Sequence, residues 1–597
     1  MTPTLAVTWN DKKGHVRATL TALALFVAIL STPAGQQVQS ASAERVSVIV
    51  REMPRVGDAP EQLVDTLGGT VESHISIIDG FTALVPQSSM SFLSNSPAIL
   101  SVTPDARIQL TSVDGHDVAA DPTSMYSVAQ QEVAASEYWT NGYTGKGVGV
   151  ALIDSGVLPV EGLTTPGKVV NGPDLSFESQ VPTLEHLDTF GHGTHMAGII
   201  AGRDDDVADP VQKGDQDHFL GMAPGAHIVN LKVADARGAA DVSQVIAAID
   251  WVVTHRNDPG MNIRVLNLSF GTDGVQDYVL DPLTFAAEAA WHQGIVVVVA
   301  GGNKGYGSSK LNNPAYDPYV IAVGAAKSNG KYSADGDTVA DFSSRGDALR
   351  SPDLVAPGAS IVSLRAPGSY IDETNPQARV ADRFFRGSGT SQAAAVVSGA
   401  AALIIEQRPG ITPDQVKALM TKSTKRIFGA TLAEQGAGMI DLKHARDMVT
   451  PGPLKSAQLF PRATGLGSLD LARGSAHVSD GDVELTGEQD IFGTAWKPAV
   501  WSALATQGSA WSGGDWLGKT WSGGCWCASS WSGASWSGAT WTGAAWSGKT
   551  WSGDTWTGKT WSGKTWSGDV WEGKTWSGKT WSGKTWSGDG WPAADGG

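Results

Sequence analysis

The stretch Val148-Gly149-Val150-Ala151-Leu152-Ile153-Asp154 is a continuous apolar run that ends on a carboxylate. A strand that is apolar on both faces is typical of a parallel sheet covered on both sides. Four later runs have the same character, at 228–233, 265–268, 295–299 and 320–323. Helical patterns lie between or after them, at 242–253, 283–292 and 392–407. This alternation predicts an α/β fold with a doubly wound, mostly parallel sheet.

Three polar residues stand at the ends of these predicted elements. Asp154 ends the first strand, whereas His192 in Gly191-His192-Gly193-Thr194-His195 and Ser391 in Gly389-Thr390-Ser391-Gln392 each open a helical pattern. Taken singly, such residues are ordinary turn or capping residues. Together they are the nucleophile, base and orienting carboxylate that acyl transfer needs, in the chain order Asp, His, Ser. Since functional groups gather at the carboxyl ends of the strands in such sheets, we expect them to meet at one edge.

Over about residues 130–445 the chain resembles the subtilisin-like serine proteases, or subtilases. Besides the three motifs above, Val299-Ala300-Gly301-Gly302-Asn303 resembles the oxyanion segment of the family, and Leu268-Ser269-Phe270-Gly271 resembles its substrate-pairing strand. The resemblance implies that Ser391 is the nucleophile, His192 the base and Asp154 its orienting carboxylate. It also implies that Asn303 stabilises the oxyanion, and that the substrate-binding residues are Ser269, Phe270, Gly271, Ala300, Gly301 and Gly302.

Two positions depart from the family pattern. Gln392 follows the nucleophile where the family usually has Met, and Ala395 stands where it usually has Pro. Neither takes part in proton transfer, so we expect an active enzyme whose pocket differs behind the nucleophile. The small residues at 300–302 favour a broad preference, with large side chains accepted before the scissile bond.

The N-terminus has the features of an export signal. Lys12, Lys13 and Arg17 precede an apolar run at 20–30, and the small-residue site Ala41-Ser42-Ala43 follows. The run is about half the length that a membrane-spanning helix needs. A signal peptide over 1–43 is therefore the preferred interpretation, with a short membrane anchor as the alternative. We expect a secreted or cell-surface protein.

Residues 44–120 form a small block in which strand-like and helix-like stretches follow one another as βαββαβ. This pattern predicts a two-layer α+β domain. The block resembles the inhibitory propeptide of subtilases, which implies that it guides folding and then inhibits its own enzyme. We expect cleavage near Ile108-Gln109-Leu110-Thr111. The predicted catalytic domain covers 121–449.

Residues 450–495 are expected to be a linker or a small β-rich appendage, and residues 496–597 a Trp-rich repeat tail. From Trp496 to Trp591 a five-residue register has 20 positions, and Trp fills every one except Thr506. A period of five suits neither an amphipathic helix nor one face of a strand. Two alternatives stay open, a stacked β-solenoid with Trp ladders and a flexible Gly/Ser-rich tether. In either case the indole rings suit binding to a cell wall or polysaccharide surface. A chain that ends near 495 should keep its proteolytic activity.

Composition excludes several classes of protein. The 597 residues are 41% hydrophobic and carry a net charge of −17, which argues against a disordered chain and against nucleic acid as a partner. The two cysteines, Cys525 and Cys527, cannot staple the core, and they form no metal-ligand pattern. No cofactor and no metal ligand are predicted. An acidic insertion at 204–217 is interpreted as a solvated loop, with a structural calcium loop as the alternative.

The sequence therefore predicts a secreted serine endopeptidase that cleaves proteins or peptides and is made as a self-processed precursor. The alternative is a non-enzymatic surface-binding or adhesion protein that uses the Trp repeats. An esterase is disfavoured because Ser391 lacks the Gly-x-Ser-x-Gly elbow of those enzymes.

Overall fold

The computed structural model describes residues 45–53, 56–75, 79–104, 117–181, 183–307, 310–480, 483–521 and most of 530–586. The chain divides into two compact units, residues 1–106 and 107–597. The predicted signal peptide (1–43), the predicted cleavage region (108–111) and both cysteines lie outside the described residues. No helix in the described ranges combines the length and the apolar character that crossing a membrane needs.

The first unit has the predicted βαββαβ order. Its elements are β1 Arg45–Glu52, α1 Ala59–Thr66, β2 Thr70–Ile75, β3 Gly80–Pro86, α2 Met90–Ser94 and β4 Ile99–Pro104. The sheet has the order β2-β3-β1-β4, and its printed pairings are antiparallel. A small core of Val48, Val50, Val64, Phe81 and Leu93 joins the sheet to the helices. Asp79, with φ of 47°, makes the turn from which β3 begins at Gly80.

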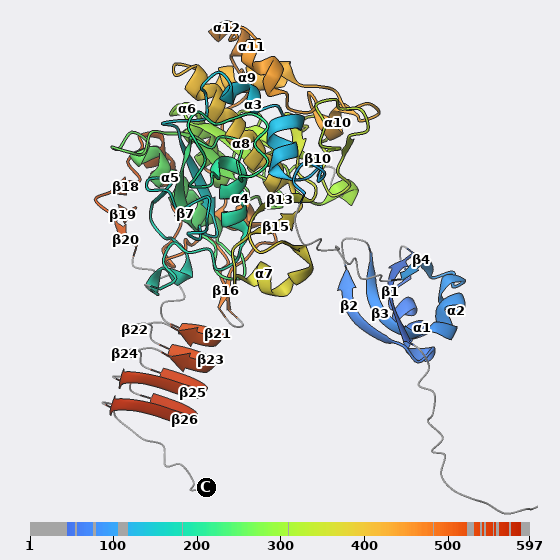
Figure 1. Ribbon diagram of the computed structural model, residues 1–597. Helices are drawn as coiled ribbons and strands as arrows, with labels where there is room; N and C mark the ends of the chain where they lie inside the picture. The colour runs from blue at the N-terminus through green and yellow to red at the C-terminus, as the bar shows by residue number, and fades with distance from the viewer. Residues whose placement is uncertain are drawn as a thin grey trace, which may run out of the picture. The chain divides into compact units, whose positions relative to one another are not determined.

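The second unit is built on an eight-stranded sheet with the order β11-β10-β9-β8-β5-β7-β6, in which β12 also pairs with β10 (Figure 1). All pairings except β10 with β11 are parallel. This confirms the predicted mostly parallel α/β fold. The strands are β5 Gly149–Asp154, β6 Val169–Asn171, β7 His227–Lys232, β8 Ile263–Leu268, β9 Val296–Ala300, β10 Ile321–Lys327, β11 Thr338–Val339 and β12 Leu354–Pro357.

Helices cover this sheet, and one of them lies almost wholly in the core. Residues 390–405 of α8 Thr390–Gln407 are all buried, because small Ala, Gly and Ser residues let the helix pack against the sheet. The other long helices are α4 His192–Ala201, α5 Val242–His255, α6 Pro282–His292 and α9 Pro413–Ser423. A small sheet orders β13 Ile361–Leu364, β15 Phe384–Gly387 and β14 Arg379–Val380. Shorter helices are α3 Ser136–Trp139, α7 Tyr370–Thr374, α10 Leu432–Gln435 and α11 Leu442–Asp447.

The segment 450–521 belongs to the core of this unit. It contains α12 Pro453–Ser456, α13 Leu469–Arg473, α14 Pro498–Thr506 and the short strands β16 Ser479–Asp480, β17 Val483–Glu484, β18 Trp511–Ser512, β19 Asp515–Trp516 and β20 Lys519–Thr520. The buried Arg473 pairs with Asp241, the N-cap of α5, at 2.7 Å. Trp496, Trp501, Trp511 and Trp516 join the main hydrophobic core. The sequence pattern changes at 496, but the folded unit continues to 521.

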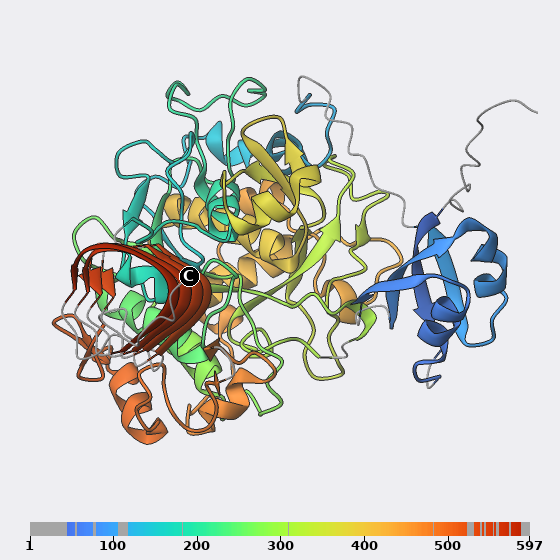
Figure 2. The same cartoon turned by 90° about the horizontal axis from the view of Figure 1, so that it is seen from below.

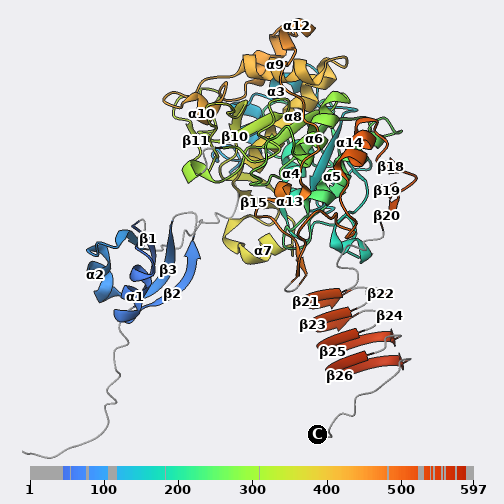
Figure 3. The same ribbon diagram turned by 180° about the vertical axis from the view of Figure 1, so that it is seen from behind.

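Later repeats form parallel strands, which Figures 2 and 3 show stacked on one another. They are β21 Ser530–Ser537, β22 Thr540–Trp541, β23 Ala545–Ser552, β24 Thr555–Trp556, β25 Thr560–Trp571 and β26 Thr575–Trp586. Trp531 pairs with Trp546, Trp546 with Trp561, and Trp561 with Trp576. Each turn thus takes fifteen residues, or three pentapeptides. This is the arrangement of the solenoid alternative.

Candidate active site

The site lies at the carboxyl ends of three adjacent strands. β5 ends at Asp154, β8 leads into residues 269–271, and β9 leads into residues 301–303. Two helices begin at the same edge, α4 with His192 as its first residue and α8 with Ser391 as its second. The structure therefore gathers the predicted residues from five separate stretches of sequence.

Asp154 and His192 form a close pair. The Nδ1 atom of His192 lies 2.8 Å from Oδ1 and 2.9 Å from Oδ2 of Asp154. The backbone N–H of Ser155 also donates to Asp154 Oδ1, at 2.8 Å. Burial lowers the pKa of His192, but the charge and hydrogen bond of Asp154 and the charge of Asp188 outweigh it, so the pKa is raised. This pairing places the proton on Nδ1 and leaves Nε2 as the basic atom.

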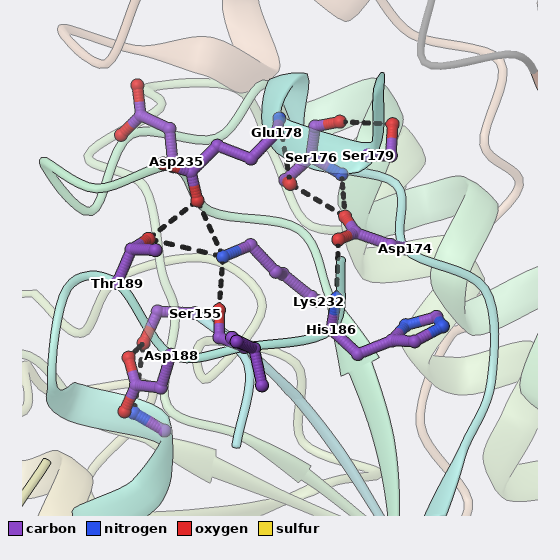
Figure 4. A network of polar contacts seen from close by, with 12 residues as sticks. Ser155, Asp174, Ser176, Glu178, Ser179, His186, Asp188, Thr189, Lys232 and Asp235 are labelled. Atoms are coloured by element: carbon purple, nitrogen blue, oxygen red, sulfur yellow. Dashed lines mark hydrogen bonds and ion pairs between the residues drawn. The ribbon is translucent and has the colours of Figure 1, made fainter. Parts of the chain in front are cut away.

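A second buried carboxylate, that of Asp188, is linked to this pair through Ser155, and Figure 4 labels Asp188 and Ser155. Asp188 accepts from the Ser155 hydroxyl at 2.8 Å, from Gly191 N at 2.6 Å and from Thr194 N at 2.7 Å. The Ser155 hydroxyl also lies 3.2 Å from Asp154 Oδ1, so it bridges the two carboxylates. Burial raises the pKa of Asp188, although these hydrogen bonds act in the opposite direction. Asp188 thereby fixes the start of α4, where His192 stands.

The loop that carries Asp188 is held by a buried lysine (Figure 4). The ammonium of Lys232 lies 2.6 Å from Glu178 Oε2 and 3.2 Å from the Thr189 hydroxyl, and it also donates to the Leu187 carbonyl. Thr189 donates to Glu178 at 2.6 Å. The side chain of Lys232 is fully buried, so the ion pair is shielded from water. It joins β7 to the loop before His192.

Ser391 is nearly buried at the N-terminus of α8, with 8% of its surface exposed. Its hydroxyl donates to the Ser269 carbonyl at 3.4 Å, and the Ser269 hydroxyl donates to the Ser391 carbonyl at 3.3 Å. The predicted substrate-pairing segment and the predicted nucleophile are thus tied together. A rotation of the Ser391 side chain about χ1 would turn its hydroxyl away from Ser269.

The amide of Asn303 is oriented by Thr390. Its Oδ1 accepts from Thr390 N at 2.8 Å and from the Thr390 hydroxyl at 3.0 Å, so Nδ2 points the other way as a donor. A Cβ on Gly389 would lie 3.5 Å from Asn303 Nδ2 and 3.6 Å from Ser391 N. The position where a side chain on Gly389 would begin is therefore bordered by both donors, and Gln392 Oε1 lies 2.8 Å from it. Two N–H donors close to one point are what an oxyanion hole requires.

The predicted substrate-binding residues lie beside this point. Ser269, Phe270 and Gly271 are half-buried, and within the described chain their backbone N–H groups make no hydrogen bond. They are therefore available to pair with an extended peptide. Ala300 and Gly301 are buried, and Gly301 N donates to Val323 O at 2.9 Å. Gly302 has φ of 110°, which favours glycine. Close packing thus requires the small residues at 301 and 302.

The acidic insertion does not gather into a cage for calcium. Asp204 pairs with Arg383 at 2.6 Å, Asp209 with Arg203 at 2.8 Å and Asp215 with His218 at 2.8 Å. Across the part of the chain that the structure describes, no group of three or more His, Cys, Asp or Glu side chains is placed to hold a metal ion. Three of the carboxylates of the insertion are thus paired with basic side chains.

Ser155, Asp188, Thr390 and Lys232 were not predicted as parts of the site. Their roles depend on contacts between segments far apart in the sequence. Two of them could have been found from their positions in the sequence. Asp188 stands shortly before His192, and Ser155 directly follows Asp154.

Known proteins match the chain over this unit. Residues 145–438 match the subtilase family, Peptidase S8. Serine protease AprX of Bacillus subtilis (strain 168) is 36% identical over 330 residues, which cover 54% of this chain and 72% of AprX. Subtilisin of Bacillus pumilus is 32% identical over 322 residues, which cover 54% of this chain and 98% of that protein. This chain belongs to the subtilase family.

The alignment with a third relative spans a larger part of this subtilase. The minor extracellular protease Epr of Bacillus subtilis (strain 168) is 27% identical over 426 residues, which cover 70% of this chain and 57% of Epr. The subtilase is a serine-type endopeptidase, and its substrates are proteins or peptides. The family match ends at 438, so the segment 450–521 and the repeats lie outside it.

Proposed function

We propose that the chain is a secreted endopeptidase that acts through Asp154, His192 and Ser391 and is made as a self-processed precursor. The observation that carries the proposal is the His192–Asp154 pair at 2.8 Å, on the same sheet edge as Ser391 and Asn303. The adhesion alternative does not require this pairing, and it does not require the oriented amide of Asn303.

In the proposed reaction, Ser391 Oγ attacks the carbonyl carbon of the scissile bond while His192 Nε2 takes its proton. The carbonyl becomes an oxyanion that accepts from Asn303 Nδ2 and Ser391 N. His192 then gives the proton to the leaving amine as the bond to nitrogen breaks, and an acyl group stays on Ser391. Water attacks that ester with His192 again as base, the bond between the acyl group and Ser391 Oγ breaks, the acid product leaves, and His192 returns the proton to Ser391. Asp154 holds the imidazole and stabilises its protonated form.

The direct test is labelling with a serine-directed fluorophosphonate, followed by mapping of the labelled peptide. We expect label on Ser391 and complete loss of both label and peptide hydrolysis in Ser391→Ala. Ser388→Ala is the matched control, because Ser388 lies three residues earlier on the exposed surface, where its hydroxyl accepts from Ser360 N. Full hydrolysis by Ser391→Ala would refute the proposal.

The pH dependence tests the role of His192. Since only neutral imidazole can act as the base, kcat/KM should rise as His192 loses its proton. Asp154 and Asp188 raise the pKa of His192, so the midpoint should lie above the ordinary value of about 6.5. A flat profile from acid to alkaline pH would exclude His192 as the base.

The first unit is proposed to be the propeptide that guides folding and then inhibits. Its independent hydrophobic core supports this part of the proposal, because the unit has its own folded structure. Wild type and Ser391→Ala should be expressed side by side. The variant is expected to stay at precursor length, whereas normal processing of the pure variant would rule out self-cleavage.

Secretion and surface binding complete the proposal. The apolar run at 20–30 supports export, and the relative Epr is named as an extracellular protease. The repeats beyond 521 are proposed to bind cell-wall or polysaccharide material. Chains with and without residues 522–597 should be compared for retention on that material at low and high salt. Equal retention would eliminate the binding role.

A further inference from the structure

Gln392 lies directly behind the nucleophile and is 6% exposed. Its Oε1 atom is buried and has no hydrogen-bond partner. The amide extends between two glycines. A Cβ on Gly389 would lie 2.8 Å from Oε1 of Gln392, and a Cβ on Gly387 would lie 2.7 Å from its Nε2.

The Gly389 end of the amide borders the oxyanion space. The same Cβ position lies 3.5 Å from Asn303 Nδ2 and 3.6 Å from Ser391 N. A third group is therefore placed around the point that the two donors face. An amide oxygen there would repel a developing negative charge, whereas an amide N–H would stabilise it.

The Gly387 end of the amide borders His195. A Cβ on Gly387 would lie 3.2 Å from His195 Nε2. His195 is 3% exposed, and neither of its ring nitrogens has a hydrogen-bond partner. Burial and the charge of the nearby His192 lower the pKa of His195 to about 3, so the ring is neutral and has one N–H to donate. With Gln392 Nε2 toward it, the imidazole makes no hydrogen bond.

A half-turn of the Gln392 amide about χ3 removes two unfavourable arrangements, the amide oxygen beside the oxyanion space and the amide nitrogen toward the His195 ring. Oε1 then faces His195 and accepts from its Nε2–H, and Nε2 faces the space beside Gly389. We propose that Gln392 in this orientation is a third hydrogen-bond donor to the oxyanion, and that His195 positions its amide. The role rests on the proposed mechanism of Ser391. It gives the residue that replaces the usual Met a catalytic function.

The test uses Gln392→Met, which keeps the approximate volume and removes the donor. In a subtilisin, loss of the oxyanion-hole asparagine lowers kcat by about 100- to 1,000-fold. For a third donor we expect a smaller loss in kcat, about 10- to 100-fold on the same scale, with KM nearly unchanged. The affinity of a peptide aldehyde, whose adduct with Ser391 has an oxyanion, should fall in parallel. Gln392→Glu should lose more, because its carboxylate not only lacks the donor but also repels the negative charge of the oxyanion.

His195→Leu tests the positioning role. His195→Leu should also lower kcat. In the Gln392→Met background it should lower kcat little further, because both changes remove the same interaction. Wild-type kcat in Gln392→Met, or a loss confined to KM or to thermal stability, would overturn the proposal. Ser391→Ala is measured in parallel. If it is inactive while Gln392→Met is fully active, only the third donor is refuted; an active Ser391→Ala refutes the proposed mechanism itself.

Discussion

The Trp-rich repeat has two structures in one chain. Between 496 and 521 its indole rings are buried against α5, and short antiparallel strands turn at Gly513-Gly514 and Leu517-Gly518. Between 530 and 586 the same spacing forms parallel strands in which Trp positions pair every fifteen residues. A five-residue period therefore does not determine the structure by itself.

The neighbouring residues decide between the two structures. The carboxylate of Asp250 on α5 accepts from Trp501 Nε1 at 3.0 Å and from Trp516 Nε1 at 2.9 Å. Trp511 Nε1 donates to the Ala247 carbonyl at 2.7 Å. The first repeats also contain Val500, Leu504 and Leu517, whereas Val570 is the only aliphatic residue larger than Ala in the later ones, in which Ser and Gly usually follow the Trp. Aliphatic residues and specific acceptors turn a repeat into part of a core.

The strongest way to break this comparison is truncation. A chain that ends at 495 loses four buried Trp side chains, and each large core truncation costs about 3–5 kcal/mol. The total is comparable to the whole stability of a typical domain, about 5–15 kcal/mol. We expect this chain to be insoluble or digested, and a chain that ends at 521 to keep full peptide hydrolysis. This replaces the expectation that activity survives truncation near 495.

Expression yield, resistance to trypsin and kcat/KM of the two truncated chains are the measurements. The chain that ends at 521 is the matched control, because it lacks only the later repeats. A folded, active chain that ends at 495 would show that the docked repeats are dispensable.

Single substitutions sharpen the comparison. Trp516→Phe removes one of the two donors to Asp250 from a fully buried position, so we expect a loss of about 3 kcal/mol in the free energy of unfolding. Trp561→Phe, in the parallel repeats, should leave the unfolding of the catalytic unit unchanged. Denaturant titrations of both variants in the Ser391→Ala background avoid self-digestion. Equal losses in the free energy of unfolding for the two variants would mean that the Trp residues at 516 and 561 contribute equally to the catalytic unit.

Much of the fold was predictable because its signals are local. The apolar runs located β5, β7, β8, β9 and β10 to within a few residues, and helical periodicity located α5, α6 and α8. The candidate site residues were predicted from short motifs at strand and helix ends, and the structure brings these motifs to one edge of the sheet. The docking of 496–521 was not predictable from period alone, since the Trp spacing does not change at 521. Asp188 and Ser155 were missed because their bridge exists only once β5 meets the loop before α4.

The buried carboxylate makes the docking sensitive to pH. Burial raises the pKa of Asp250 to about 7, although the hydrogen bonds from Trp516 and Trp501 act in the opposite direction. The unfolded value is about 3.9, so between these values the folded state holds a proton that the unfolded state has lost. The free energy of unfolding should therefore fall as pH rises from about 4 to 7.

Between about pH 5 and pH 8 we expect this carboxyl to account for a loss of about 3 kcal/mol in the free energy of unfolding relative to Asp250→Asn. The amide oxygen of the variant still accepts from both indoles and does not titrate in this range. Glu132 and Asp317 also have pKa values raised to about 7 by burial, so only the difference between wild type and variant reports on Asp250. Identical slopes in the two proteins would show that the docked repeats do not respond to pH.

The smallest effect is expected in the parallel repeats, where the register itself can be tested. Deletion of the five residues 566–570 leaves every later Trp opposite a Trp, because the pentapeptides are nearly equivalent. Deletion of the three residues 567–569 sets Trp against other residues in the strands that follow, and in-register stacking depends on equivalent residues. We expect the β-sheet signal in circular dichroism to survive the first deletion and to fall in the second, with peptide hydrolysis unchanged in both. If the two deletions behave alike, the repeats act as a tether, and the difference between the two Trp-rich regions is that only the first one folds.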